Sequence, residues 1–165
     1  MRFSVWKKGE KKKKFYLRLD DRLIHGQVVQ GWVPFLSIDE IFVVSDRISS
    51  DPMQQKIMSL SVPPDVSLHF IDTSRIPSIS DVSNGKNVLI LVNNVDDLVK
   101  VASLVPVEFV NVGNYHKRGE NVVNLTSFFT CSLEELEKLK ILSREGKKVE
   151  LRNIPGEKGK EIIDD

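Results

Sequence analysis

One segment of eleven residues concentrates the side chains of this sequence that are best suited to chemistry. It reads Arg-Leu-Asp-Asp-Arg-Leu-Ile-His-Gly-Gln-Val and covers positions 18–28. The segment places one imidazole, His25, within a few residues of two guanidinium groups and two carboxylates. A neutral imidazole nitrogen can act as a nucleophile, and positive groups can neutralise charge on a transferring phosphoryl group. These residue types therefore favour phosphoryl transfer through His25.

The charged neighbours of His25 have distinct predicted roles. Arg22 and Arg18 flank the loop and can balance charge on the equatorial oxygens of a phosphoryl group. Asp20 or Asp21 can accept a hydrogen bond from the ring nitrogen that is not phosphorylated, which fixes the tautomer of the ring.

The two residues after His25 suit the binding of phosphate. Gly26 lets a phosphoryl group approach the backbone closely, and Gln27 can donate a hydrogen bond to it. We predict His25, Arg22 and Asp21 as catalytic residues, with Asp20 as the alternative carboxylate, and Arg18, Gly26 and Gln27 as phosphate-binding residues.

A purely structural interpretation of the same segment stays open on spacing alone. A lone histidine at a junction between a strand and a helix is more often an ordinary turn residue than a nucleophile. The Asp-Asp-Arg sequence is also common as a helix cap with a local ion pair.

The residues around the segment predict a strand before it and a helix after it. Residues 15–19 form a short apolar run, and residues 27–36 repeat apolar side chains with helical spacing. His25 then lies immediately before a helix, where free backbone N–H groups and the helix dipole favour a phosphate.

Apolar runs and helical patterns alternate along the rest of the chain. Helix starts are predicted at Asp51-Pro52, at Asn93 or Asn94, and at a capping box formed by Ser132 and Glu135. Leu133 begins an apolar helix face that is expected in the core. Further strands are predicted over residues 40–45, 66–71, 88–92, 108–112 and 148–152, the last at an edge.

This alternation predicts an α/β fold with a mostly parallel central sheet, helices on both faces and an antiparallel edge strand. The carboxyl ends of parallel strands form the usual working surface of such sheets. The loops expected to gather there are residues 20–26, 45–50, 72–75, 93–94 and 113–118.

Length and composition indicate one soluble domain in the cytoplasm. The chain has 165 residues, of which 41% are hydrophobic and 28% charged, and no apolar run approaches the ~20 residues of a spanning helix. Cys131 is the sole cysteine, which excludes an intrachain disulfide and gives no support to secretion.

Residues 1–14 are predicted to be a flexible basic arm, and residues 15–165 a single domain. The arm carries a net charge of +6 and the remainder carries −5. A basic patch on the fold itself is what nucleic-acid binding would require, so no nucleic-acid partner is expected. Attraction of the arm to an anionic membrane is a weaker alternative.

Other candidate side chains predict neither a metal site nor a cofactor site. The three histidines and Cys131 lack the spacing of metal ligands, and no nucleotide-binding glycine motif occurs. His69 is expected to pack in a strand and His116 to be exposed in a loop. Cys131 is predicted to be a structural thiol, although the start of a helix can lower the pKa of a cysteine.

The segment at 18–28 resembles the signature of the mannose/fructose/sorbose-family IIB components of the bacterial phosphoenolpyruvate-dependent sugar phosphotransferase system (PTS). Matches to the family follow in order along residues 15–152, at Ile-Phe-Val-Val-Ser-Asp (41–46), Asp51-Pro52, Pro63-Pro64 and Asn111-Val112-Gly113.

The resemblance implies that His25 is phosphorylated on its pros nitrogen. The group would come from a histidine of a IIA component and pass to a sugar at the IIC/IID membrane permease. The chain would thus be a cytoplasmic protein-Nπ-phosphohistidine–sugar phosphotransferase that meets the membrane through its partners.

Two loops depart from the family pattern. Gly113-Asn114 stands where relatives commonly have two glycines, and Asp46-Arg47 replaces a more usual acidic pair. A non-catalytic IIB-like module that regulates or binds partners through the same surface is therefore the alternative function.

Overall fold

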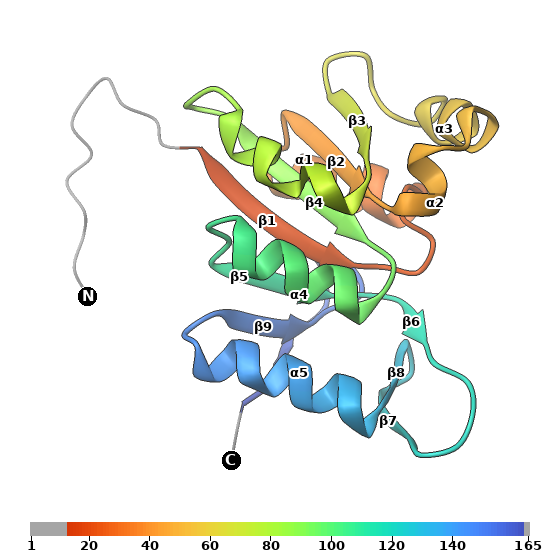
Figure 1. Cartoon of the computed structure of the whole chain (residues 1–165), viewed down its shortest axis with the longest axis vertical. Helices are drawn as coiled ribbons and strands as arrows, with labels where there is room; N and C mark the ends of the chain where they lie inside the picture. The colour runs from red at the N-terminus through yellow and green to blue at the C-terminus, as the bar shows by residue number, and fades with distance from the viewer. Residues whose placement is uncertain (1–12, 164–165) are drawn as a thin grey trace.

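The strand that leads into residues 18–28 lies in the middle of a seven-stranded sheet (Figure 1). The computed structural model describes residues 13–163. The strands of the sheet are β1 (Lys14–Leu19), β2 (Glu40–Val44), β3 (Ser67–Ile71), β4 (Asn87–Val92), β5 (Phe109–Val112), β9 (Lys148–Leu151) and β10 (Lys160–Glu161). Their order is β10-β9-β5-β1-β4-β2-β3, and the pairs are parallel except for β9 with β10.

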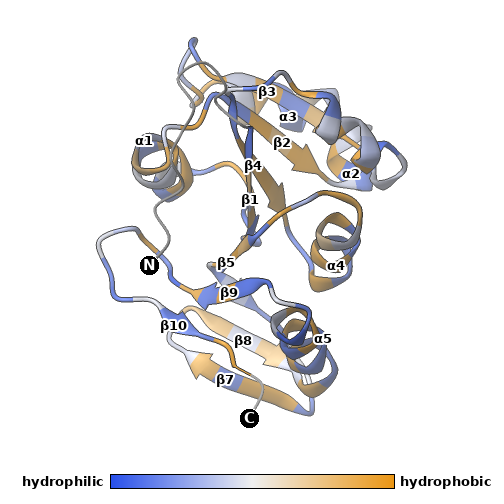
Figure 2. Ribbon diagram, turned by 90° about the vertical axis from the view of Figure 1, so that its left-hand side faces the viewer, coloured by the Kyte–Doolittle hydropathy of each residue, from blue (hydrophilic) through white to orange (hydrophobic). Residues whose placement is uncertain are grey.

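Helices cover both faces of this sheet, as predicted. They are η1 (Gln27–Trp32), α1 (Val33–Phe35), α2 (Asp46–Ser49), α3 (Pro52–Ser59), η2 (Thr73–Asp81), α4 (Val95–Leu104) and α5 (Leu133–Arg144). Helix α1 lies on one side of the sheet, and α4 and α5 lie on the other (Figure 2). Because successive side chains of a strand point to opposite faces, Leu17 and Leu19 enter one core and Tyr16 packs against the other.

Local capping residues set the helix starts that the sequence predicts. The side chains of Asp51 and Asn94 each accept a hydrogen bond from a backbone N–H three residues later. Ser132 and Glu135 form the complete capping box, in which each side chain accepts from the backbone of the other. These contacts confirm the three predicted helix starts.

The antiparallel edge strand exists, but it is a different segment from the one predicted. Strand β9, expected at the edge, pairs in parallel with β5 and on its other side with β10. The edge is therefore β10, a two-residue strand. It is too short and too polar to carry an apolar alternation, so no sequence pattern indicates it.

A second, three-stranded sheet follows β5, in a region where we expected a loop at residues 113–118 and predicted no strand. It contains β6 (Tyr115–His116), β7 (Val122–Thr126) and β8 (Phe129–Ser132), in the order β6-β8-β7. Phe129 and Cys131 of β8 point into the core beneath α5. The loop prediction was wrong at β6. This strand has only two residues, which is too short for an apolar alternation, and it forms by pairing with β8.

The loops after β2 and β3 meet at the carboxyl edge of the sheet, as expected. The carboxylate of Asp46 accepts a 2.8 Å hydrogen bond from the backbone N–H of Thr73. Two short helices not predicted from sequence, α2 and η2, begin at this contact. Each has an N-cap side chain, Ser45 for α2 and Asp72 for η2.

The predicted basic arm at residues 1–14 lies mostly outside the described residues. Lys14 is the first residue of β1, so this strand begins one residue earlier than expected. Within residues 13–163, none of the helices has both the length and the apolar character needed to cross a membrane.

The apolar face of α5 is narrower than the sequence indicated. Leu139 and Leu142 are buried, whereas the side chain of Leu133 is 57% exposed. Side chains in a helix tilt toward its N-terminus, so Leu133 at the first position projects past the core. The prediction of Leu133 as a core residue was wrong.

This difference predicts unequal costs for two leucine truncations on one helix. Leu139→Ala should lower the free energy of unfolding by about 2–5 kcal/mol because it leaves a cavity. Leu133→Ala, the matched control, should change it by less than about 0.5 kcal/mol. Urea denaturation of the two variants measures both values, and equal losses would refute this placement of α5.

Candidate active site

His25 lies at the carboxyl edge of the sheet, in the loop that follows β1, and this loop contacts the loop that follows β5. The chain after β1 enters η1 on one face, whereas the chain after β5 leads to α5 on the opposite face. The backbone N–H of Gly113, just after β5, donates to the carbonyl of Leu19 at 2.8 Å. Neighbouring strands whose connections leave in opposite directions create the usual ligand-binding crevice of such sheets.

The turn before His25 is held in a rarely occupied backbone conformation. Leu23 has φ = 57°, a region that a branched residue rarely adopts and that costs about 1–3 kcal/mol. Its N–H donates to the carbonyl of Asp20, and its side chain is buried with Val28 and Ile41. These contacts fix the turn, and so fix the position of the two residues that follow.

The imidazole of His25 contacts one carboxylate. Its Nε2 lies 2.9 Å from Oδ2 of Asp20, and the side chain is 13% exposed. A carboxylate can accept but not donate, so Nε2 carries the hydrogen of this bond. In the neutral ring, Nδ1 therefore holds the free electron pair.

Asp20 is a buried carboxylate with three hydrogen-bond donors. Besides His25, it accepts from Nη2 of Arg18 at 2.9 Å and from the backbone N–H of Arg22 at 3.1 Å. Burial raises the pKa of Asp20, but the hydrogen bond with His25 and the charge of Arg18 outweigh it and hold that pKa below its ordinary value. Asp20 is consequently ionised at neutral pH.

Asp21, which was predicted to be catalytic, contacts Asn114 in the loop after β5. Its Oδ1 accepts from Nδ2 of Asn114 at 3.0 Å, and its N–H donates to the carbonyl of Asn114 at 2.8 Å. Asp20 continues the strand and lies two residues after Arg18, so both side chains share one face. Of the two carboxylates left open by the sequence, the structure therefore places Asp20 against His25, and the role predicted for Asp21 does not fit.

Arg18 also lies elsewhere than its predicted phosphate-binding role requires. Its side chain is 1% exposed and sits beneath Asp20, with its guanidinium 5.2 Å from the ring centroid of Trp32. Its terminal nitrogens already donate to protein acceptors. A phosphoryl group on His25 therefore does not find a free guanidinium at Arg18.

Arg22, Gly26 and Gln27 do lie on the open side of the loop. Arg22 is exposed, and its Nη2 donates to Oε1 of Gln27 at 3.2 Å. Gly26 has an ordinary right-handed conformation, and a Cβ built on it would meet no heavy atom within 4 Å. Glycine is thus not required there by the backbone, and its effect is to leave open space beside His25.

The first turns of the helix after His25 are π-helical. The carbonyl of His25 accepts hydrogen bonds from the N–H groups of Val28 and Val29, both at 3.0 Å. Such turns are uncommon and often occur at functional sites. The apolar spacing of residues 27–36 predicted a helix but could not distinguish π-helical turns from α-helical ones.

The other three candidate side chains lie in different surroundings. His69 stacks on Phe42 and contacts Glu40 at 3.1 Å in the edge strand β3, and His116 is exposed. Cys131 lies in β8 and is fully buried, which together with the charge of Glu135 raises the pKa of its thiol to about 11. The pKa of Cys131 is thus not lowered by the helix start, and its burial supports the predicted role as a structural thiol.

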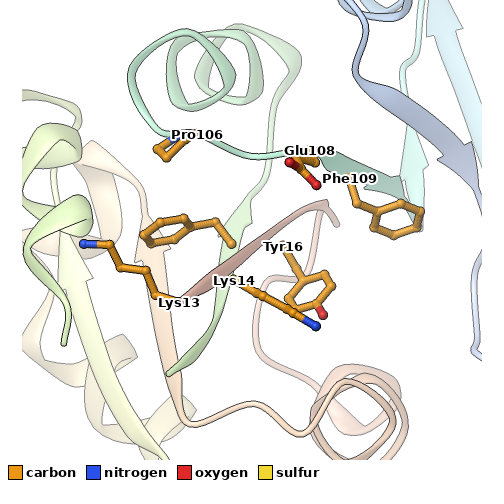
Figure 3. Close-up of a pocket in the computed structure, with 7 residues that line it drawn as sticks. Lys13, Lys14, Tyr16, Pro106, Glu108 and Phe109 are labelled. Carbon is orange, nitrogen blue, oxygen red and sulfur yellow. The ribbon is translucent and has the colours of Figure 1, made fainter. Parts of the chain in front are cut away.

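A separate hollow lies at the other end of the sheet. It has a volume of about 480 Å³ and is lined by Lys13, Tyr16, Glu108 and Phe109 among others (Figure 3). These residues lie in or directly before the amino ends of β1 and β5, so the hollow is remote from His25. In the described range 13–163, His, Cys, Asp and Glu side chains form no group of three that could hold a metal ion.

Comparisons with known proteins identify the family of this chain. The family model for the PTS system sorbose subfamily IIB component matches residues 15–164. The fructose-specific EIIB component of Bacillus subtilis is 29% identical over 88% of this chain and 91% of its own length. The mannose-specific EIIAB component of Escherichia coli is 30% identical over 83% of this chain, which spans 43% of that longer protein.

A solved structure has the same fold. The N-acetylgalactosamine-specific IIB component 1 of Escherichia coli superposes with a TM-score of 0.83 at 24% identity, covering 90% of this chain and 99% of that one. The match to the family model extends over nearly the whole chain and includes the loop that holds His25. The chain therefore belongs to the sorbose subfamily of PTS IIB components, the phosphoryl-carrying phosphotransferases of bacterial sugar transport.

Proposed function

We propose that His25 is the phosphoryl carrier of this protein and that Nδ1 of its ring forms the bond to phosphorus. The phosphoryl group comes from the phosphohistidine of a IIA component and passes to a sugar bound at a IIC/IID permease on the cytoplasmic side of the membrane. The observation that carries the proposal is the 2.9 Å contact between Nε2 and Asp20, which leaves Nδ1 as the nucleophile.

Asp20 supports the transfer electrostatically. As the electron pair of Nδ1 forms the bond to phosphorus, the bond to the donor nitrogen breaks and its electron pair stays with the donor. The ring of His25 gains positive charge in this step, and the ionised carboxylate on Nε2–H stabilises that charge. In the second transfer, a hydroxyl oxygen of the sugar forms the bond to phosphorus and displaces Nδ1, which recovers its electron pair, while the hydroxyl proton is released to solvent.

The open side of the loop receives the phosphoryl oxygens. Arg22 supplies a positive charge, and Gln27 supplies an amide donor. The backbone at the start of η1 adds N–H groups that can donate to an anion. The bare Cα of Gly26 lets the group lie against the backbone. Phosphoryl transfer depends mainly on such positioning and charge neutralisation.

The relatives support the partners but leave the sugar undetermined. The name of the mannose-specific EIIAB component combines IIA with IIB, in keeping with a IIA donor for this chain. Other relatives are named for fructose, N-acetylgalactosamine and sorbose. One fold thus serves several sugars, and we assign the choice of sugar mainly to the permease.

The first prediction concerns the nucleophile itself. Radiolabelled phosphoenolpyruvate, passed through the general carriers and a cognate IIA component, should put acid-labile label on the wild type and none on His25→Ala. Circular dichroism should show that His25→Ala stays folded. His69→Ala, a histidine on the edge strand β3, serves as the control and should label like the wild type. An unlabelled wild type with active controls would instead favour the partner-binding module.

The second prediction concerns the space beside His25. Gly26→Ala should slow phosphorylation at least tenfold, because the new methyl group occupies the place of a phosphoryl oxygen. The thermal midpoint should remain unchanged or rise slightly, since the backbone conformation accepts alanine and no neighbour is met. Labelling of Gly26→Ala at the wild-type rate would show that the phosphoryl group lies elsewhere.

The third prediction follows from the lowered pKa of Asp20. An acid with a depressed folded pKa stabilises the protein above its ordinary pKa, and the stabilisation is lost as the pH falls through the folded value. Asp20→Asn should therefore cost about 2–3 kcal/mol at pH 7. The difference from the wild type should shrink below about pH 4. Denaturation of both proteins across pH 3–7 measures it, and a pH-independent difference would rule out this ionised state.

A further inference from the structure

We propose that Arg18 is a positioning residue that holds Asp20 against His25, and that the chain after β9 forms part of the structure that holds Arg18. We call the residues around its guanidinium the Arg18 cradle: Asn111, Gly113, Arg152 and Asn153. This inference rests on the proposed function, since its effect on chemistry is exerted through His25.

The terminal nitrogens of Arg18 are each shared between two acceptors. Nη1 donates to Oδ1 of Asn111 and, at 3.1 Å, to the carbonyl of Arg152. Nη2 donates to Oδ2 of Asp20 at 2.9 Å and to the carbonyl of Asn153 at 3.1 Å. The planar guanidinium is therefore fixed by its partners on other strands and loops, and it directs one N–H to the oxygen that also receives His25.

Gly113 makes room for this arrangement. A Cβ built on Gly113 would overlap the guanidinium of Arg18, with Nη2, Cζ and Nη1 as its nearest atoms. The φ of Gly113 is not positive, so the backbone itself does not demand glycine. The requirement for glycine arises from the close approach of Arg18.

The chain after β9 is itself anchored on three sides. The carbonyl of Asn153 accepts from Nε1 of Trp32 in η1 at 3.0 Å, and that of Arg152 accepts from Nδ2 of Asn111 in β5 at 3.1 Å. The side chain of Arg152 pairs with the buried carboxylate of Glu150 at 2.5 Å. Residues far apart in the sequence thus meet under the site and set the position of Arg18.

The chemical effect of the cradle is on the tautomer of His25. With Arg18 in place, Asp20 is ionised and oriented so that Oδ2 accepts from Nε2, which leaves the electron pair on Nδ1. If the guanidinium is displaced, the carboxylate loses a charged donor and is free to rotate about its side-chain bonds. The ring can then carry its hydrogen on either nitrogen, which reduces the reactive form.

The variant that tests this is Gly113→Ala, which inserts a methyl group where the guanidinium lies. In uniformly 15N-labelled, unphosphorylated protein, the two ring nitrogens of His25 report the tautomer directly. The wild type should show nearly pure Nε2–H at a pH where the ring is neutral, and Gly113→Ala should show a mixture. Asn114→Ala, the next residue along the loop, contacts Asp21 rather than Arg18 and should match the wild type.

A double-mutant cycle tests whether Gly113 acts through Arg18. Gly113→Ala and Arg18→Ala should each slow phosphorylation of His25, and the double variant should be no slower than Arg18→Ala. Multiplying effects, or a wild-type tautomer and rate in Gly113→Ala, would overturn the inference. If Arg18→Ala fails to fold, the tautomer of His25 in Gly113→Ala is sufficient by itself to support or overturn the inference.

Failure of this inference and failure of the proposed function give different results. If His25 is not the carrier, the wild type takes up no label, whatever the tautomer of its ring. If His25 is the carrier but Arg18 does not position Asp20, the wild type is labelled and Gly113→Ala is labelled equally fast.

Discussion

The site depends on the hydrogen bonds that the buried carboxylate of Asp20 accepts. The carboxylate receives hydrogen bonds from His25, Arg18 and the backbone of Arg22. A charge removed from water costs several kcal/mol unless it is paired and hydrogen-bonded, and these donors supply that compensation. The same bonds select the ring nitrogen of His25 that is free to react, so stability and chemistry depend on one group.

The fold serves to bring these donors to one place. Arg18 and Asp20 share a face because they are two residues apart along β1 and its extension, where Asp20 still donates its N–H to the end of β4. The strained turn at Leu23 then brings His25 back over Asp20. Strand β5 and the chain after β9 complete the surroundings of Arg18.

The sequence predicted the features that depend on local patterns. Apolar runs identified the parallel strands, and capping residues such as Asp51, Asn94 and Ser132 located helix starts, because both signals arise within a few residues. The position of His25 between β1 and η1 followed from the same reasoning. The short strands β6 and β10 were missed because their stability comes from partners distant in the sequence.

The sequence predicted which residues belong to the candidate site, but not the role of each of them. The alternation of a strand would have paired Arg18 with Asp20, but the sequence does not show that the strand geometry continues to Asp20 and ends before Asp21. Nothing near Arg18 in the sequence reveals that carbonyls of Arg152 and Asn153 lie beside it. Buried polar networks join distant segments, so their partners become visible only in three dimensions.

The identity of the phosphorylated nitrogen is the property to measure first. In 15N-labelled protein phosphorylated through its IIA partner, the ring nitrogen bonded to phosphorus is identified by its chemical shift and its coupling to phosphorus. We expect phosphorus on Nδ1 of His25, with Nε2–H still bound to Asp20. Phosphorus on Nε2 would mean that Asp20 does not hold that nitrogen in the reactive state, which would contradict the role of Asp20 in selecting the nucleophile.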